Sequence, residues 1–238
     1  DFFNIYLKEL GKVTTYLKKQ HHFSPNDKYK SFELKIFTDN FVFGYPWEDE
    51  FGELELGQIF DILSHIQLQF AKKGIYFRGA VTVSPLFMDQ DIVLGPALLE
   101  AYELENKHAV YPRIVLSKDV STILKEHISY YTKGSSPQSS QYLVDVDGYY
   151  FINYLYILYD FKNPSKQKVT KELLLHKEAI VRNLNENSTN YKVLEKYIWI
   201  AKYHNFFIRN FAVVNNPTID VSALSIEEEL YTLEIKMV

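Results

Sequence analysis

The chain of 238 residues contains no cysteine, which excludes disulfides, thiolate metal sites and a cysteine nucleophile. It also lacks the glycine-rich signatures of P-loop and dinucleotide-binding proteins, and the G-x-S-x-G turn of hydrolases. Those three enzyme classes therefore have no motif here. A cysteine-free chain fits a reducing compartment, and we expect a cytoplasmic location.

Long apolar runs and a basic stripe are missing as well. The longest apolar stretch, 149–161, is interrupted by Asn153 and Asp160 and is shorter than the ~20 residues that a membrane-spanning helix needs. The formal net charge is −4, from 26 basic and 30 acidic residues that are mixed along the chain. We therefore expect neither a membrane nor a nucleic acid as partner.

Apolar and aromatic residues are abundant, at 47% and 16%, and predict a well-packed core. Apolar periodicity predicts helices at 2–19, 57–73, 97–107, 118–128, 168–184 and 190–206. Alternation and turn residues predict strands at 31–45 (a hairpin turning at Thr38–Asn40), 75–84, 91–94, 112–117, 142–152 (a hairpin through Asp147 and Gly148) and 229–238. This order predicts an α+β fold, a mixed sheet with helices packed on one side.

The first hairpin is the most informative segment. Lys35, Phe37 and Asp39 share one face of it, because side chains alternate along a strand. A carboxylate at such a turn is exposed on a rigid support, and Mg²⁺ or Mn²⁺ prefers one or two carboxylates together with substrate phosphates. An Asp-Asn turn is also a common connector of strands. These residues alone therefore leave a metal site and a purely structural turn both open.

Several segments taken together carry a family resemblance. The succession FTDNFVFG, RGAVTVS, DIVLGPALLEAYELE and PRIVLS resembles the core of class III nucleotidyl cyclases over residues 1–120. Over nearly the whole chain, the sequence is similar to the pyrimidine cyclases of bacterial Pycsar anti-phage systems. The segments that carry this similarity are GPALLEAYELE, YPRIVLS, DGYYFINYL and KYIWIAKYHN. The resemblance implies a cyclase-like catalytic domain at 1–160 and a helical extension with a C-terminal strand at 161–238. It further implies conversion of UTP or CTP to a 3′,5′-cyclic nucleotide and pyrophosphate, as a second messenger in anti-phage immunity.

The resemblance also assigns roles to individual residues. Asp39 matches a metal-binding aspartate, which implies Mn²⁺ or Mg²⁺ as cofactor. Lys35 falls where adenylate cyclases place the lysine that contacts the base, and Phe37 and Arg113 are the further substrate-binding candidates. Arg78 is the candidate catalytic residue, a cation that stabilises charge on the transferring phosphorus. Because class III sites form between two domains, a homodimer is implied.

Other positions depart from the family pattern. The aspartate that partners the lysine falls at Ile92 or next to it at Asp91; strict spacing from Gly95 gives Ile92, and the loss of a carboxylate there argues against a purine base. In the family, an asparagine and an arginine stabilise the transition state. At the matching positions this sequence has Leu99 and Glu103 instead. A further metal aspartate lies, in the family, on a strand ahead of the first helix, and that strand is not in this sequence; Asp1 runs directly into the helix.

Two alternatives remain open. The departures at Leu99 and Glu103 favour a catalytically silent cyclase-like domain that binds a nucleotide or a protein. An RNA-binding sheet is a more distant alternative, in which Phe37, Phe41 and Phe43 stack on bases, although the acidic balance of the chain counts against it. Both Arg78 and Arg113 are also open to a structural interpretation as ion-pair partners.

Overall fold

The computed structural model describes residues 2–20, 32–37, 40–47, 52–89, 91–131, 136, 138–160, 165–213 and 220–227. The helices are α1 (Phe2–Gln20), α2 (Gly52–Ala71), α3 (Pro96–Lys107), α4 (Lys118–Ser129), α5 (Ile157–Asp160), α6 (Lys166–Glu186), α7 (Tyr191–Phe207) and α9 (Val221–Leu224), with a 3₁₀ turn η1 (Tyr154–Tyr156) and a π-helical turn η2 (Ile208–Ala212). The strands are β1 (Glu33–Phe37), β2 (Asn40–Gly44), β3 (Gly79–Val81), β4 (Phe87–Met88), β5 (Val93–Leu94), β6 (Ile114–Leu116), β7 (Tyr142–Val144) and β8 (Tyr150–Ile152).

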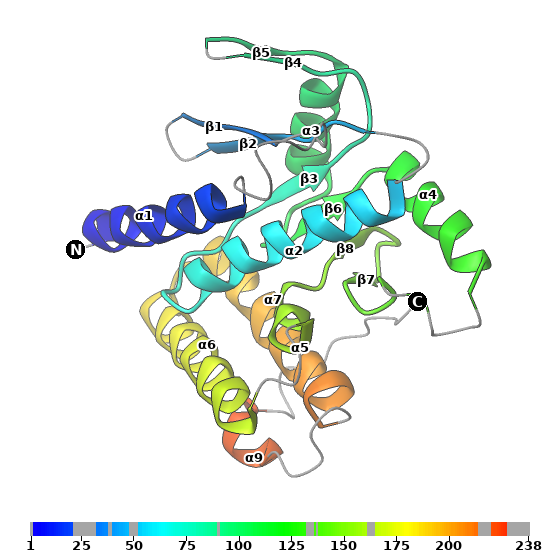
Figure 1. The fold of residues 1–238 in the computed structure, drawn as a ribbon. Coiled ribbons are helices and arrows are strands. Elements are labelled where there is room, and N and C mark those ends of the chain that lie inside the picture. The colour runs from blue at the N-terminus through cyan, green and yellow to red at the C-terminus, as the bar shows by residue number, and fades with distance from the viewer. Residues whose placement is uncertain are drawn as a thin grey trace.

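The strands form three separate sheets within these residues (Figure 1). A four-stranded sheet has the order β3-β6-β8-β7, in which β3 and β6 are parallel and the other neighbours are antiparallel. The hairpins β1–β2 and β4–β5 are two-stranded sheets of their own. The predicted α+β class with a mixed sheet is confirmed. The strand predicted at 75–84 is paired only at Gly79–Val81, β4 was not predicted, and the strand predicted at 229–238 lies outside the described residues.

A glycine and a serine cap determine where the helices α3 and α4 begin. Gly95 precedes α3 with φ of 145°, and a Cβ there would lie 2.5 Å from the carbonyl oxygen of Pro85, so only glycine fits. Pro96 then occupies the first turn, where its missing N–H costs no helical hydrogen bond. Ser117 caps α4 by accepting a hydrogen bond from the amide of Val120. These local signals explain why both helix starts agree with the sequence prediction to within a residue.

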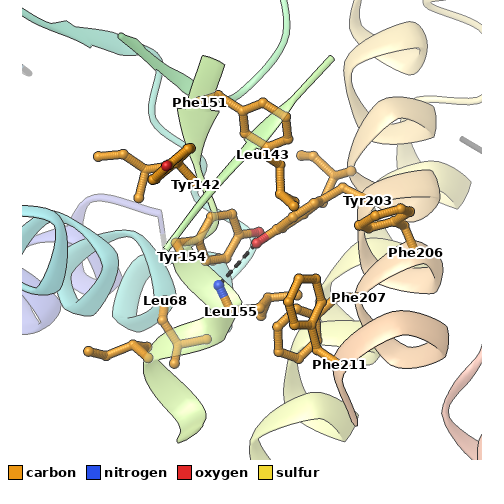
Figure 2. Packing of buried hydrophobic residues seen from close by; sticks show 14 of the residues in the cluster. Leu68, Tyr142, Leu143, Phe151, Tyr154, Leu155, Tyr203, Phe206, Phe207 and Phe211 are labelled. Carbon is orange, nitrogen blue, oxygen red and sulfur yellow. Dashed lines mark hydrogen bonds between the residues drawn. The ribbon is translucent and has the colours of Figure 1, made fainter. Parts of the chain in front are cut away.

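The largest apolar cluster, here the main core, joins the sheet to the C-terminal helices (Figure 2). The hydroxyl of Tyr203 on α7 donates to Oδ1 of Asn153 at 2.7 Å and accepts from the amide of Leu155 at 3.0 Å. Phe151 on β8 packs edge-on against Tyr203, and Phe207 stacks with Phe211 one turn further along. The main core thus contains residues from both sides of the domain boundary predicted at 160.

A buried chain of hydrogen bonds ties α6, α7 and α9 together. The Nε2 of His204 lies 3.1 Å from the carbonyl oxygen of Leu224, and the Nδ1 atoms of His204 and His176 are 2.9 Å apart. The Nε2 of His176 lies 2.7 Å from the hydroxyl of Tyr154. Since a carbonyl only accepts, the pattern fixes one direction: His204 donates to Leu224, His176 donates to His204, and Tyr154 donates to His176. His204 is therefore a buried histidine with a partner at each ring nitrogen.

A second, smaller cluster, here the hairpin core, supports the β1–β2 hairpin. Val13 and Leu17 of α1 meet Ile66 and Phe70 of α2, and Phe32 completes the buried set. Phe41 and Phe43 of β2 pack against it. Among the described helices, none combines the length and the apolar character that crossing a membrane requires.

Candidate functional site

The predicted β1–β2 hairpin forms and carries two of the predicted site residues, although Asn40, which was expected in the turn, is the first residue of β2. Phe37 pairs with Asn40 and Lys35 with Val42. Lys35 is half-buried, whereas the ring of Phe37 is 47% exposed. Asp39, the predicted metal ligand, lies outside the described residues. The hairpin therefore brings Lys35 and Phe37 to the end of β1 that leads into the Asp39 turn.

The second hairpin, β4–β5, lies beside the first (Figure 1), and a Cβ on Gly44 would be 2.9 Å from the Sδ atom of Met88. In its loop, Oδ1 of Asp89 accepts hydrogen bonds from the amides of Ile92 at 2.7 Å and Asp91 at 2.8 Å. Those two amides, and then the charge of Lys35, lower the pKa of the exposed Asp89 carboxyl below its ordinary value. Asp89, and not position 92, therefore carries the carboxyl whose pKa the charge of Lys35 helps to lower.

Asp89 was not among the predicted site residues. Ile92, the position that family spacing indicates, is 48% exposed and apolar. The sequence does contain a pattern for this hairpin, an Asp-x-Asp loop between two short apolar pairs. However, β4 has only two paired residues, which is too short to show the alternation that predicts a strand. Without that hairpin, nothing local indicates that Asp89 approaches Lys35.

Arg78 lies just before β3 and is held against the C-terminal end of α3. Its Nη2 atom forms an ion pair with Oε1 of Glu105 at 3.0 Å, and Nη1 donates to the carbonyl oxygen of Ala109 at 3.3 Å. Both partners are at the negative end of the helix dipole, which attracts a cation. Glu105 therefore serves as the counter-ion of Arg78.

Arg113 is inside the protein, with 1% of its surface exposed. Its guanidinium forms ion pairs with Asp145 and Asp147 and donates to the carbonyl oxygen of His108 at 3.0 Å. Trp199 donates to the same Asp145 carboxylate at 3.0 Å. These contacts link β6, the β7–β8 turn and α7. The geometry favours the structural interpretation of Arg113 and gives no support to the substrate-binding role predicted for it.

A cavity of about 1150 Å³, here the interstrand cavity, separates the β1–β2 hairpin from the four-stranded sheet. Its walls come from β2, from the segment around β3, and from facing sides of α2 and α3. Phe37 and Arg78 both line it, whereas Lys35 and Arg113 do not. Most of the lining is apolar, with Glu105 and Tyr102 among the exceptions.

The positions matched to the transition-state residues face solvent. Leu99 on α3 is 69% exposed. Glu103, one turn further, accepts from Lys107 at 3.2 Å in an exposed ion pair. Neither side chain offers a donor to a developing negative charge.

The described residues alone do not supply the side-chain ligands of a metal site. No three His, Asp or Glu side chains gather closely enough to hold a metal ion in the part of the chain that the structure describes. A site at Asp39 would need donors outside that part, or from the substrate's phosphates.

Two of the three aromatic residues invoked for RNA stacking are not available for it. Phe41 packs edge-on against Phe70 and Phe77, at ring-centroid distances of 6.3 and 5.3 Å. Phe43 packs against Phe32 at 6.2 Å. An RNA-binding sheet exposes such rings to bases, so the RNA-binding alternative loses two of its three stacking residues and keeps only Phe37.

No protein-family model, no curated protein and no solved structure matches this chain.

Proposed function

We propose that the chain is a pyrimidine nucleotidyl cyclase that converts UTP or CTP to the 3′,5′-cyclic nucleotide and pyrophosphate, as a messenger in anti-phage immunity. The observation that carries the proposal is that two hairpins lie beside each other (Figure 1), with the charge of Lys35 on β1 among the causes that lower the pKa of Asp89 in the β4–β5 loop. The site is open, since Asp89 is exposed and Lys35 is only half-buried. This arrangement supports recognition of a planar ring with donors and acceptors on one edge.

The charges of Lys35 and Asp89 suit the edge of a pyrimidine. An ammonium group only donates hydrogen bonds and an ionised carboxylate only accepts them. Uracil offers a carbonyl to the ammonium and its ring N–H to the carboxylate. Cytosine offers its amino group to the carboxylate and its ring nitrogen or carbonyl to the ammonium. The pair therefore fits either base, and the choice between them rests on other contacts.

The reaction in this proposal is attack of the ribose 3′-hydroxyl on the α-phosphorus. The new P–O bond closes the cyclic phosphate, the bond to the β-phosphate breaks, and pyrophosphate leaves. Mn²⁺ or Mg²⁺ held through Asp39 would lower the pKa of the hydroxyl and neutralise the phosphates. Arg78 lines the adjacent interstrand cavity and is partly exposed; it meets substrate charge only after exchanging Glu105 for it.

A homodimer is part of the proposal, and an exposed apolar surface supports it. Phe87 and Leu94 face each other across β4–β5 and are 52% and 54% exposed. Leu99 and Tyr102 on α3 are exposed as well. Phe87 and Leu94 lie on the hairpin that carries Asp89, and exposed apolar patches mark interaction surfaces. Because the surface includes the hairpin that carries Asp89, a second subunit on it would lie next to the proposed base site.

The second candidate is a catalytically silent cyclase-like domain that binds a nucleotide. It is favoured by Leu99 and Glu103, which give no transition-state donors, and by the ion pair that occupies Arg78. Under this alternative, Lys35 and Asp89 still bind the base. The two candidates therefore differ in turnover and not in binding.

One experiment separates them. The protein is incubated with each of the four nucleoside triphosphates and Mn²⁺, and cyclic product is identified by mass spectrometry. Cyclic UMP or CMP from the wild type, lost in Asp39→Ala and kept in Asp119→Ala, supports the cyclase; Asp119 is the matched control because it is an exposed carboxylate on α4. No product, with nucleotide binding that weakens in Lys35→Ala, supports the silent domain. Product from ATP or GTP alone would refute a pyrimidine enzyme.

A further inference from the structure

The last segment that the structure describes, residues 220–227, packs against the C-terminal helices. It begins with the single turn α9, which contacts α6 and η2 (Figure 1). After this turn, Ser225 is extended, with φ of −66° and ψ of 152°. Leu224 and Ile226, on either side of Ser225, are 1% and 3% exposed and belong to the main core. The segment therefore inserts two apolar side chains that are two positions apart.

Two neighbouring side chains of α7 bind the backbone of this segment. Asn205 makes two hydrogen bonds with Ile226: its side-chain nitrogen donates to the carbonyl oxygen at 2.7 Å, and its Oδ1 atom accepts from the amide at 2.9 Å. His204 donates from Nε2 to the carbonyl oxygen of Leu224 at 3.1 Å. Because every residue has these backbone groups, the hydrogen bonds fix the path of the segment and do not select its sequence.

A lysine of α6 binds the backbone of the segment from the other side, and the segment closes its own turn. Lys177 donates from Nζ to the carbonyl oxygen of Ala223 at 2.8 Å. Within the segment, Oδ1 of Asp220 accepts from the amide of Ala223 at 3.2 Å and from the hydroxyl of Ser222 at 2.6 Å. Lys177, His204 and Asn205 are here the anchor residues. The segment thus carries its own local structure and is held from outside by side chains.

No helix or sheet ladder joins this segment to the other described residues. Its one backbone hydrogen bond outside regular helix, from the amide of Ser225 to the carbonyl oxygen of Val221, is internal. The segment can therefore leave with its turn intact and without breaking secondary structure elsewhere. Its departure would remove hydrogen bonds from His204 and Asn205, which are 0% and 1% exposed, and such a loss at buried polar groups is costly. The anchor residues therefore favour an occupant with the same backbone groups.

We propose that the anchor residues and the adjoining main core form a peptide-recognition site, which residues 220–227 occupy in cis as a separable docking segment. The ligand is a peptide with one helical turn and then an extended stretch, with Leu and Ile two positions apart. These two side chains provide the specificity, since they are the groups of the segment that enter the core. Covalent linkage keeps the site filled, because it gives the segment an effective concentration on the order of millimolar. The inference is independent of the proposed activity.

The test supplies the segment as a separate molecule. The probe is a fluorescent peptide with the sequence of residues 220–227, and the receptor is the whole chain with Leu224→Asp and Ile226→Asp, whose own segment cannot bury these side chains. We expect saturable binding to this receptor by anisotropy, about tenfold or more tighter than to the wild type, whose site is filled in cis. A peptide with the same two substitutions should not bind. Equal binding of the two peptides, or no binding by the folded receptor, would overturn the proposal.

The role of the anchor residues is tested in the same receptor. Asn205→Ala should weaken binding of the peptide about tenfold or more, because two hydrogen bonds to its backbone are lost. Asn210→Ala is the matched control, since the side chain of Asn210 donates to the carbonyl oxygen of Phe206 in its own helical segment. It should leave the affinity unchanged. Equal affinities in the two variants would show that the anchor contact does not contribute and would overturn backbone recognition.

A measurement on the wild type keeps the proposal falsifiable if the receptor fails to fold. Amide hydrogen exchange is followed at low urea concentrations. The amide of Ile226, which is bound by Asn205, should exchange through a local opening while the amides of α6 and α7 stay protected. Exchange of Ile226 only together with global unfolding would show that the segment is an inseparable part of the core. Because no nucleotide is used, none of these outcomes bears on the cyclase assay.

Discussion

Acidification should destabilise this chain through the buried pair His176 and His204. Both rings are fully enclosed. Burial lowers the pKa of His204 from 6.5 to about 4, with Lys177 acting in the same direction and the carbonyl of Leu224 against it. Burial also lowers the pKa of His176 well below 6.5, helped by the neighbouring His204 and by Lys72. Both histidines are therefore neutral in the folded chain at neutral pH.

The sign and size of the effect follow from these pKa values. Between pH 6.5 and about 4, the unfolded chain binds a proton at His204 that the folded chain does not, so the free energy of unfolding falls as the pH falls. The slope approaches about 1.4 kcal/mol per pH unit, which gives about 2 kcal/mol of lost stability between about pH 7.5 and 5. His176 adds to the loss. His65, whose pKa burial lowers to about 4, adds less because it is partly exposed and solvent screens its charge.

Urea unfolding, followed by circular dichroism at several pH values from about 7.5 to 5, measures this dependence. The range stops before most carboxylates protonate. The double variant His176→Leu, His204→Leu should be less stable at neutral pH, because Tyr154 and the carbonyl of Leu224 lose their partners, yet its stability should fall less steeply with acid. His127→Gln on α4 is the control and should keep the wild-type slope. Equal slopes in the wild type and the double variant would refute the assignment to this pair.

Three further changes test other parts of the fold. Arg113→Ala should lower the free energy of unfolding by about 3–5 kcal/mol, because Asp145 is left as a buried unpaired charge; a loss below about 1 kcal/mol in urea would contradict the buried pairing. Gly95→Ala should lower the melting temperature and expression yield, since its Cβ meets the Pro85 carbonyl; an unchanged melting temperature would show that the loop relaxes freely. Ser117→Ala should cost about 1 kcal/mol by calorimetry, because the amide of Val120 loses its acceptor; an unchanged stability would show that this cap does not contribute.

Local signals predicted the parts of the fold that local chemistry controls. The first hairpin turns at a residue pair suited to turns, α3 begins at Gly95 and Pro96, and the turn at Gly148 has a φ of 83° that favours glycine. The helices agree in type because apolar periodicity over many residues is a strong signal. Boundaries differ most at α2, which begins at Gly52, ahead of the periodic segment that starts at 57.

Contacts between distant segments were not predictable in the same way. Arg113 meets Asp145 across 32 positions, and His176 meets His204 across 28. Neither periodicity nor spacing predicts such pairs. The sequence therefore predicts a substrate-binding role for Arg113, whereas the fold supplies it with counter-ions. The approach of Asp89 to Lys35 has the same origin, since it depends on how two hairpins lie relative to each other.

The two halves of the molecule differ in how well their polar groups are paired. This difference predicts which half responds to binding. In the C-terminal half, buried polar groups such as Asn153, His176 and Asp145 have defined partners, and breaking one leaves a costly unsatisfied group. The site half consists of two hairpins that are each paired only within themselves, beside a cavity with open strand edges. Elements with few supporting contacts open at low free energy, and binding sites are drawn from such elements. Nucleotide binding should therefore slow hydrogen exchange in β1, β2, β4 and β5 and leave α6 and α7 unchanged; equal protection across both halves would show that the chain responds as a single cooperative unit.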